Sequence, residues 1–247
     1  MIPAGEIVLY WYSHDGVSAD TSSDLHLLDD VELARHRAFE CPKMADLFAF
    51  RHSLLRRLLA HHCSIPAAQL KFDAGPNGKP SLSDGCENVH FNTSHTKNFG
   101  VVAVCENGPI GIDVERVRPL DLAAFSEKIL SSAERLEFAA LSQQLRLPAM
   151  LRYWTAKEAL IKAEGMGLNL NLLRQISIRG SANDYGWSAA ELTGPMMRKT
   201  PWHLWTQTLT DPSPRPAIVA IASRNQRPVS IRSALEFLKG QPPELPN

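Results

Sequence analysis

The sequence has no long apolar run and no net charge, and each absence narrows the possible classes of protein. No apolar stretch approaches the roughly 18 residues that a membrane-spanning helix needs, so no membrane partner is expected. Lysine plus arginine and aspartate plus glutamate number 26 each, which gives no overall attraction to nucleic acid. The first residues lack the basic region and apolar run of a signal peptide. A cytoplasmic monomer is therefore expected.

Paired cysteines and the common nucleotide-binding loops are also missing. The 4 cysteines form no C-x-x-C pair, so reduced thiols are expected and a cysteine-bound metal is not. Neither G-x-x-x-x-G-K-[ST] nor G-x-G-x-x-G occurs, which removes the usual backbone cradles for phosphate. If this chain binds a phosphate compound, side chains must hold it.

The chain has the size and composition of a globular protein with a well-buried core. It has 247 residues, of which 44% are hydrophobic and 21% charged. Apolar spacing predicts helices over 44–62 and 149–164, and a third helix opened by the capping pair Ser131 and Glu134. Strands are predicted at 6–12, 70–73, 89–95, 100–108, 110–117, 175–179, 202–209 and 216–223.

Both halves of the chain thus run strand, helices, strands. This order predicts an α+β fold of two similar lobes, an N-terminal lobe over 1–108 and a C-terminal lobe over 109–227. A tail over 228–247 is expected to hold one short helix before a proline-rich end that frays.

The stretch "GIDVERV", residues 111–117, places two carboxylates on one face of a predicted strand. Side chains two apart on a strand leave the same face, so Asp113 and Glu115 stand side by side. For a lone D-x-E a solvated face is the more common explanation, so the rest of the chain must decide between solvent and a ligand.

A third carboxylate comes from the stretch "WTAKEALIKAEG" of the second long helix. Trp154, Glu158, Ile161 and Lys162 fall on one helical stripe, although Glu158 and Lys162 are also spaced as a simple i,i+4 ion pair. Three carboxylates from a strand and a facing helix suit Mg²⁺, which prefers hard oxygen ligands completed by water and a substrate's phosphates. Lys162, one turn beyond Glu158, would then reach a phosphate, and further phosphate contacts are available from Lys79, His95 and the basic helix.

Four motifs taken together resemble a known family. "GPNGKP", "FNTSH", "GIDVE" and "WTAKEALIKAEGMGL", in this order and spacing over roughly residues 30–225, resemble the Sfp-type 4′-phosphopantetheinyl transferases. The resemblance implies two pseudo-symmetric α+β lobes with coenzyme A between them. It also implies Mg²⁺-dependent transfer of the phosphopantetheine arm to a serine of an acyl or peptidyl carrier protein, a transient partner, with release of adenosine 3′,5′-bisphosphate.

The resemblance assigns the chemistry to the C-terminal lobe. Asp113, Glu115 and Glu158 correspond to the family's Mg²⁺ ligands. Glu158 is also the candidate base that deprotonates the attacking serine, directly or through a water. Lys162 would neutralise the charge that develops on the leaving phosphate.

The resemblance assigns most coenzyme A contacts to the N-terminal lobe. The candidates are Ser94 and His95 for phosphate, Lys79 and Pro80 beside the adenosine, Arg51 for the 3′-phosphate and Arg35 as a further cation. Phe48 departs from the pattern, since some members carry a small polar residue there. A strand histidine such as His95 is also compatible with a purely structural role.

Two other functions remain open from the sequence. The chain could be a non-catalytic module that binds coenzyme A or a carrier protein, or another Mg²⁺-dependent enzyme of phosphate or pyrophosphate compounds. The intact set of Asp113, Glu115, Glu158 and Lys162 favours the transferase.

Overall fold

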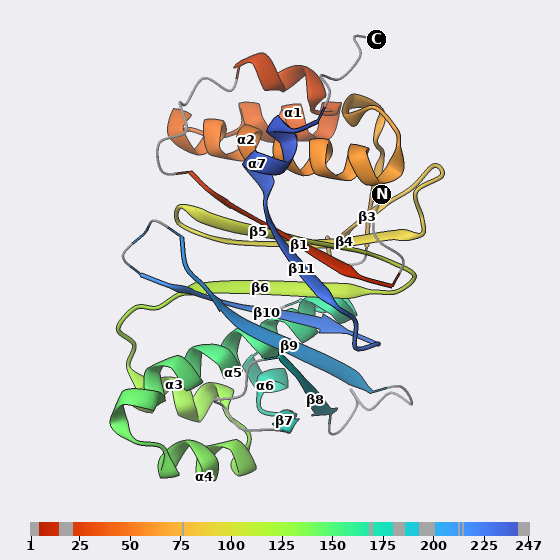
Figure 1. Cartoon of the computed structure of the whole chain (residues 1–247). Coiled ribbons are helices and arrows are strands. Elements are labelled where there is room, and N and C mark those ends of the chain that lie inside the picture. Colours follow the sequence, from red (N-terminus) through yellow and green to blue (C-terminus); the bar gives the residue numbers. More distant parts are fainter. Residues whose placement is uncertain are drawn as a thin grey trace.

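The computed structural model describes residues 5–14, 22–75, 77–167, 170–179, 186–192, 201–211, 213 and 215–241. Two sheets lie face to face, with one long helix on the outer side of each (Figure 1). The α+β fold class predicted from the sequence is confirmed.

The first sheet has the strand order β11-β1-β5-β4, and α2 covers its outer face. The N-terminal elements are β1 (Ile7–Ser13), η1 (Ser22–Leu27), α1 (Asp30–Arg37), α2 (Pro42–Cys63), η2 (Ala67–Gln69), β2 (Phe72–Ala74), β3 (Pro80–Leu82), β4 (Val89–Thr96) and β5 (Phe99–Glu106). Strands β2 and β3 form a separate small hairpin.

The second sheet has the order β6-β10-β9-β8-β7, and α5 covers its outer face. The elements that follow β5 are β6 (Ile110–Arg116), α3 (Leu122–Ile129), α4 (Ser132–Ala140), α5 (Gln143–Glu164), α6 (Leu170–Leu173), β7 (Ile176–Arg179), β8 (Gly186–Leu192), β9 (Trp202–Leu209) and β10 (Ala217–Ser223). Helix α5 begins at Gln143 rather than at the predicted 149 and continues through Pro148.

Three apolar layers hold these elements together, because alternate residues of a strand face opposite sides of its sheet. On β1, Val8 and Tyr10 pack toward α2, whereas Ile7 and Leu9 pack into the layer between the two sheets. A third layer lies between the second sheet and α5. The faces of the two sheets are therefore closed by packing, and a ligand site between the lobes must lie at the sheet edges.

Two predicted helix ends, the start of α4 and the end of α5, are confirmed. Ser131 and Glu134 form a reciprocal capping box at the start of α4, and Gly165 ends α5 with a φ of 68°. Glu134 also pairs with the fully buried Lys157 of α5, whose ammonium donates to the carbonyls of Ile129 and Leu173. This single ammonium attaches α3, α4 and α6 to the back of α5.

The tail does more than carry the predicted helix. After β10 the chain returns to the first sheet, where β11 (Val229–Ser233) pairs in parallel with β1, and α7 (Ala234–Lys239) packs beside α2 (Figure 1). The expected frayed end falls on 242–247, outside the described residues. Among the helices that the structure describes, none is long and apolar enough to cross a membrane.

Candidate active site

The site is built on the close packing of β6 against α5. A Cβ added to Gly111 would lie 2.0 Å from the carbonyl oxygen of Ala159 and 2.5 Å from the amide nitrogen of Ala163. Only glycine therefore permits this approach of strand and helix. Residues 113 and 115 leave the same face of β6 as Gly111, so Asp113 and Glu115 also face α5.

Asp113 is the centre of a buried polar triangle between the lobes. Its Oδ1 accepts from Ser94 Oγ of β4 at 2.8 Å and from Lys162 Nζ of α5 at 2.8 Å. Lys162 Nζ also donates to Ser94 Oγ at 3.0 Å. Burial raises the pKa of Asp113, although the Lys162 charge and both hydrogen bonds oppose that shift.

The other two predicted carboxylates, Glu115 and Glu158, lie close enough to Asp113 for its negative charge to raise their pKa values. Burial and the Asp113 carboxylate raise the pKa of Glu115, although Arg118 and the side chain of Trp154 oppose that shift. Burial, followed by the Asp113 charge, raises the pKa of Glu158 to about 7. Glu158 Oε1 is buried and has no hydrogen-bond partner in the structure.

These residues suit a divalent cation chemically, but they are not arranged as a finished metal site. Three mutually repelling carboxylates and a buried, unpaired carboxylate oxygen are what a hard cation would neutralise and coordinate. However, no group of three or more His, Cys, Asp or Glu side chains within the described ranges is arranged to hold a metal ion. The Lys162 ammonium instead supplies the positive charge beside Asp113.

A second charged cluster surrounds Arg51 of α2. Its Nη1 lies 3.1 Å from His95 Nε2 of β4, its Nη2 donates to the Lys97 carbonyl at 3.2 Å, and its Nε donates to His14 Nε2 at 3.4 Å. Burial lowers the pKa of His95 to about 4, and the charges of Arg51 and Lys162 act in the same direction. The structure thus brings together Arg51 and His95, two predicted ligand contacts, and adds His14, which had no signal in the sequence.

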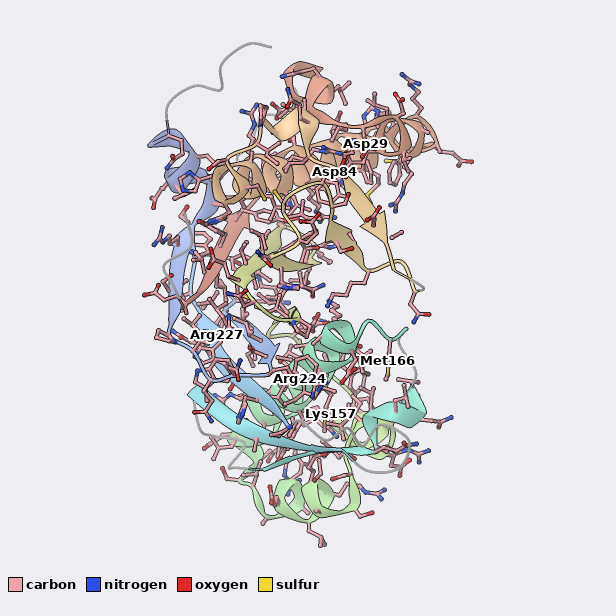
Figure 2. The ribbon with its side chains drawn as sticks, turned by 90° about the vertical axis from the view of Figure 1, so that its right-hand side faces the viewer. Asp29, Asp84, Lys157, Met166, Arg224 and Arg227 are labelled. Carbon is pink, nitrogen blue, oxygen red and sulfur yellow. The ribbon has the colours of Figure 1, made fainter. Side chains whose placement is uncertain are left out.

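Lys79, a predicted coenzyme A contact, is held by backbone carbonyls of the C-terminal lobe. Its ammonium donates to the carbonyls of Ile110 at 2.8 Å and Ala163 at 3.0 Å, and burial lowers its pKa to about 8. It therefore joins the β2–β3 hairpin to the C-terminal lobe. A cavity of about 440 Å³ adjoins it, lined also by Pro80 and by Met166, which Figure 2 shows below that hairpin.

Arg35 stands apart from the Arg51 cluster. It is exposed on α1, and its guanidinium carbon lies 5.4 Å from the centre of the Phe48 ring. None of the contacts recorded for the described residues joins Arg35 to Arg51. Phe48 itself is buried and stacks on His52, with 3.9 Å between ring centres.

Comparison with known proteins shows what this part of the chain is similar to. The model of the 4′-phosphopantetheinyl transferase superfamily matches residues 109–222, which include β6 and α5. The resemblance predicted from the motifs is confirmed over this part of the chain.

Individual relatives are similar to this chain over stretches of 119–144 residues. The chain is 34% identical over 144 residues to the 4′-phosphopantetheinyl transferase HetI of a Nostoc species, covering 57% of this chain and 61% of HetI. It is 31% identical over 144 residues to the transferase psf-1 of Bacillus pumilus, covering 55% and 60%. It is 29% identical over 119 residues to the transferase Sfp of Bacillus subtilis, covering 48% and 52%. The matched stretches thus span between about half and three fifths of these relatives.

Proposed function

We propose that this chain is a 4′-phosphopantetheinyl transferase, which moves the phosphopantetheine arm of coenzyme A to a serine of an acyl or peptidyl carrier protein. The observation that carries the proposal is the meeting of Ser94, Asp113 and Lys162 between the lobes, with the unpaired oxygen of Glu158 nearby. The superfamily match and the names of the relatives support the same reaction.

Asp113, Glu115 and Glu158 would hold Mg²⁺, which when bound would neutralise charge on the coenzyme A pyrophosphate. The carboxylates have the chemistry that this ion prefers, and the unpaired Glu158 Oε1 is a free ligand atom. Lys162, whose ammonium lies 2.8 Å from Asp113, would face the same phosphates.

The protein's own groups then have separate tasks. In the reaction, the serine oxygen of the carrier forms a bond to the β-phosphorus of coenzyme A, and the bond from that phosphorus to the oxygen bridging the two phosphates breaks. Lys162 faces the negative charge that moves onto the departing adenosine 3′,5′-bisphosphate, where a preorganised cation stabilises the transition state most. Glu158 is the candidate acceptor of the serine proton, directly or through a water, because its buried Oε1 has no hydrogen-bond partner and it lies near Asp113 and Lys162.

The N-terminal lobe would bind the nucleotide end of coenzyme A. Arg51 supplies the positive charge for the 3′-phosphate with the neutral His95 beside it, and the cavity beside Lys79 and Pro80 offers about 440 Å³ for the adenosine. The nucleophile belongs to the carrier protein, so the chain needs no nucleophilic serine or cysteine of its own.

Mass spectrometry of a carrier protein tests the proposal. After incubation with the chain, Mg²⁺ and coenzyme A, the apo carrier should gain roughly 340 Da, the mass of the arm that the cofactor chemistry supplies. A chelator should prevent the gain, and Asp113→Ala should nearly abolish it while the protein stays folded. Binding of coenzyme A without a mass gain would favour a non-catalytic module. Consumption of coenzyme A without carrier modification would favour another enzyme of phosphate compounds.

A further inference from the structure

The outer edge of β6 needs hydrogen-bond partners that its own sheet does not supply. Strand β6 ends the second sheet and pairs on one side only, with Ile112 opposite Ile221 of β10. Ile110 and Ile112 are nevertheless almost fully buried, at 1% and 0% exposure. Backbone groups that point away from β10 at these residues are out of reach of bulk water, and each would be costly to leave unpaired.

Two side chains of the N-terminal lobe satisfy this edge. Asn92 Oδ1 accepts the backbone N–H of Ile112 at 2.9 Å, and Lys79 Nζ donates to the carbonyl of Ile110 at 2.8 Å. Asn92 is itself only 7% exposed. It lies in "FNTSH" on β4, the edge strand of the first sheet, so the two sheets are joined edge to edge through a side chain.

The position of Asn92 links this bond to the site. Asn92 and Ser94 are two apart on β4 and leave the same face of the strand. Asn92 holds the backbone of Ile112, and Ser94 holds the carboxylate of the next residue, Asp113. These two bonds fix the register of β6 against β4, and a shift of either strand would separate Ser94 from Asp113.

We propose that Asn92 is a positioning residue, whose side-chain carbonyl sets the place of Asp113 relative to Ser94 and Lys162. The role in catalysis rests on the proposed transferase function, but the geometric role does not. Asn92 touches no reacting atom in this proposal, and it acts through the strand that carries Asp113.

Three variants separate positioning from simple stability. Asn92→Leu keeps a similar volume and removes the acceptor, and Asn92→Asp keeps an acceptor oxygen. Val104→Ala of β5 is the matched control, because Val104 is fully buried in the layer facing α2 and its truncation destabilises the same sheet without touching β6. If Asn92→Leu does not fold, Asn92→Ala replaces it.

Hydrogen exchange and metal binding give readouts that do not need turnover. The Ile112 amide should exchange at least about tenfold faster in Asn92→Leu than in the wild type, because its only acceptor is gone. Mn²⁺, as a probe of the carboxylates, should bind at least about tenfold more weakly to Asn92→Leu and nearly normally to Asn92→Asp and Val104→Ala. Unchanged Mn²⁺ affinity in Asn92→Leu, or an equal loss in Val104→Ala, would overturn the proposal.

Kinetics then tests the catalytic part. With saturating Mg²⁺, Asn92→Leu should lower kcat about tenfold or more and change KM for coenzyme A less than about threefold, since the Arg51 cluster is intact. Asn92→Asp should recover most of the turnover. A normal kcat in Asn92→Leu, or failure of Asn92→Asp to recover it, contradicts the catalytic role. If the wild type itself modifies no carrier, the proposed function fails, and the exchange and Mn²⁺ measurements still decide whether Asn92 positions Asp113.

Discussion

Arg51 is a half-buried cation whose recorded guanidinium partners are uncharged. Two imidazole nitrogens and one carbonyl oxygen surround it, and burial lowers its pKa. His95 is held neutral near pH 7 because its pKa lies at about 4. Among the residues that the structure describes, these contacts give the Arg51 charge no neutralising carboxylate, and an anionic ligand would supply the missing charge.

Arg51→Ala should weaken coenzyme A about tenfold to a hundredfold, because a charge-assisted contact contributes about 1.5–3 kcal/mol. The loss for 3′-dephospho-coenzyme A should be much smaller if Arg51 contacts the 3′-phosphate. Calorimetric titration of both ligands measures the difference. Arg57→Ala is the control, since Arg57 lies on the same helix but pairs with Asp24 at 2.9 Å. Equal losses for the two ligands would place Arg51 elsewhere on coenzyme A.

Glu158 should make the metal-free protein less stable as pH rises. Its folded-state pKa of about 7 lies above the unfolded value of roughly 4.3, so the folded state holds a proton that the unfolded state releases between these values. The stabilisation is complete below the unfolded pKa and is lost as pH rises through the folded pKa. With a chelator present, we therefore compare the free energy of unfolding of Glu158→Gln with that of the wild type at each pH. The variant's advantage over the wild type should be larger at pH 8 than at pH 5, by roughly 1–3 kcal/mol.

Urea unfolding at both pH values measures this effect, with Glu127→Gln as a control because Glu127 is an exposed carboxylate of α3. The same dependence on pH in Glu158→Gln and the wild type would mean that Glu158 is ionised in the metal-free fold. Mg²⁺ should reduce the difference between the two proteins, since a bound cation favours the carboxylate.

Single residues differ in how far the sequence predicts their surroundings. Asp113 and Lys162 follow from strand and helix periodicity, and the structure joins them at 2.8 Å. Asn92 and His14 could not be assigned in this way, because their partners lie on other elements and only the tertiary fold brings them together. Lys79 is identified in the sequence by the "GPNGKP" motif, but its two carbonyl partners depend on how the lobes meet.

At the scale of elements, the approach of β6 to α5 governs the site. Gly111→Ala should be strongly destabilising, because the added methyl group would meet backbone atoms of α5 at 2.0 and 2.5 Å, and backbone cannot move aside as a flexible side chain can. The cost should be about 3 kcal/mol or more, at the upper end for overpacking. Urea unfolding checks the stability, and Mn²⁺ binding checks whether the carboxylates still face α5.

Gly167→Ala is a matched control for this change, since a Cβ at Gly167 would meet nothing within 4 Å. It should leave both stability and Mn²⁺ binding nearly unchanged. A Gly111→Ala protein as stable as the Gly167→Ala protein would show that α5 can move away from β6 at little cost. The distance between β6 and α5 at the site would then be less tightly fixed than the packing around Gly111 indicates.

Elements were predictable where their signals are local. The capping box of α4 and the left-handed Gly165 were found from the sequence, because each depends on neighbouring residues. Helix α1 was missed because it is short and lacks an apolar stripe, although Asp29 and Glu32 form a capping box that could have revealed its start. Strand β11 was missed because its pairing partner, β1, lies at the other end of the chain.

At the scale of the whole molecule, the chain closes on itself on the side away from the site. Strand β11 and strand β4 are the opposite edges of the first sheet, so the returning C-terminal segment covers one edge while β4 meets β6 at the other. Arg227 reinforces the return by donating to the carbonyls of Glu106 and Asn107 at the end of β5. The C-terminal segment should therefore contribute to stability rather than to ligand binding.

A chain that ends at Arg227 tests this division. It loses the parallel pairing of β1 from Ile7–Val229 to Trp11–Ser233, and it loses Phe237, whose ring centre lies 5.0 Å from that of Tyr10. The melting temperature should fall by about 10 °C or more, since roughly 2–4 °C is lost per kcal/mol in a protein of this size, and the bare β1 edge should promote aggregation. At a temperature where the shortened chain is still folded, its affinity for coenzyme A should be close to that of the full chain, because β4, Arg51 and the β6–α5 face are retained.

A normal melting temperature would mean that β11 adds little to the first sheet. If the shortened chain folds but does not bind coenzyme A, the C-terminal segment must instead influence the site from the opposite edge of the first sheet.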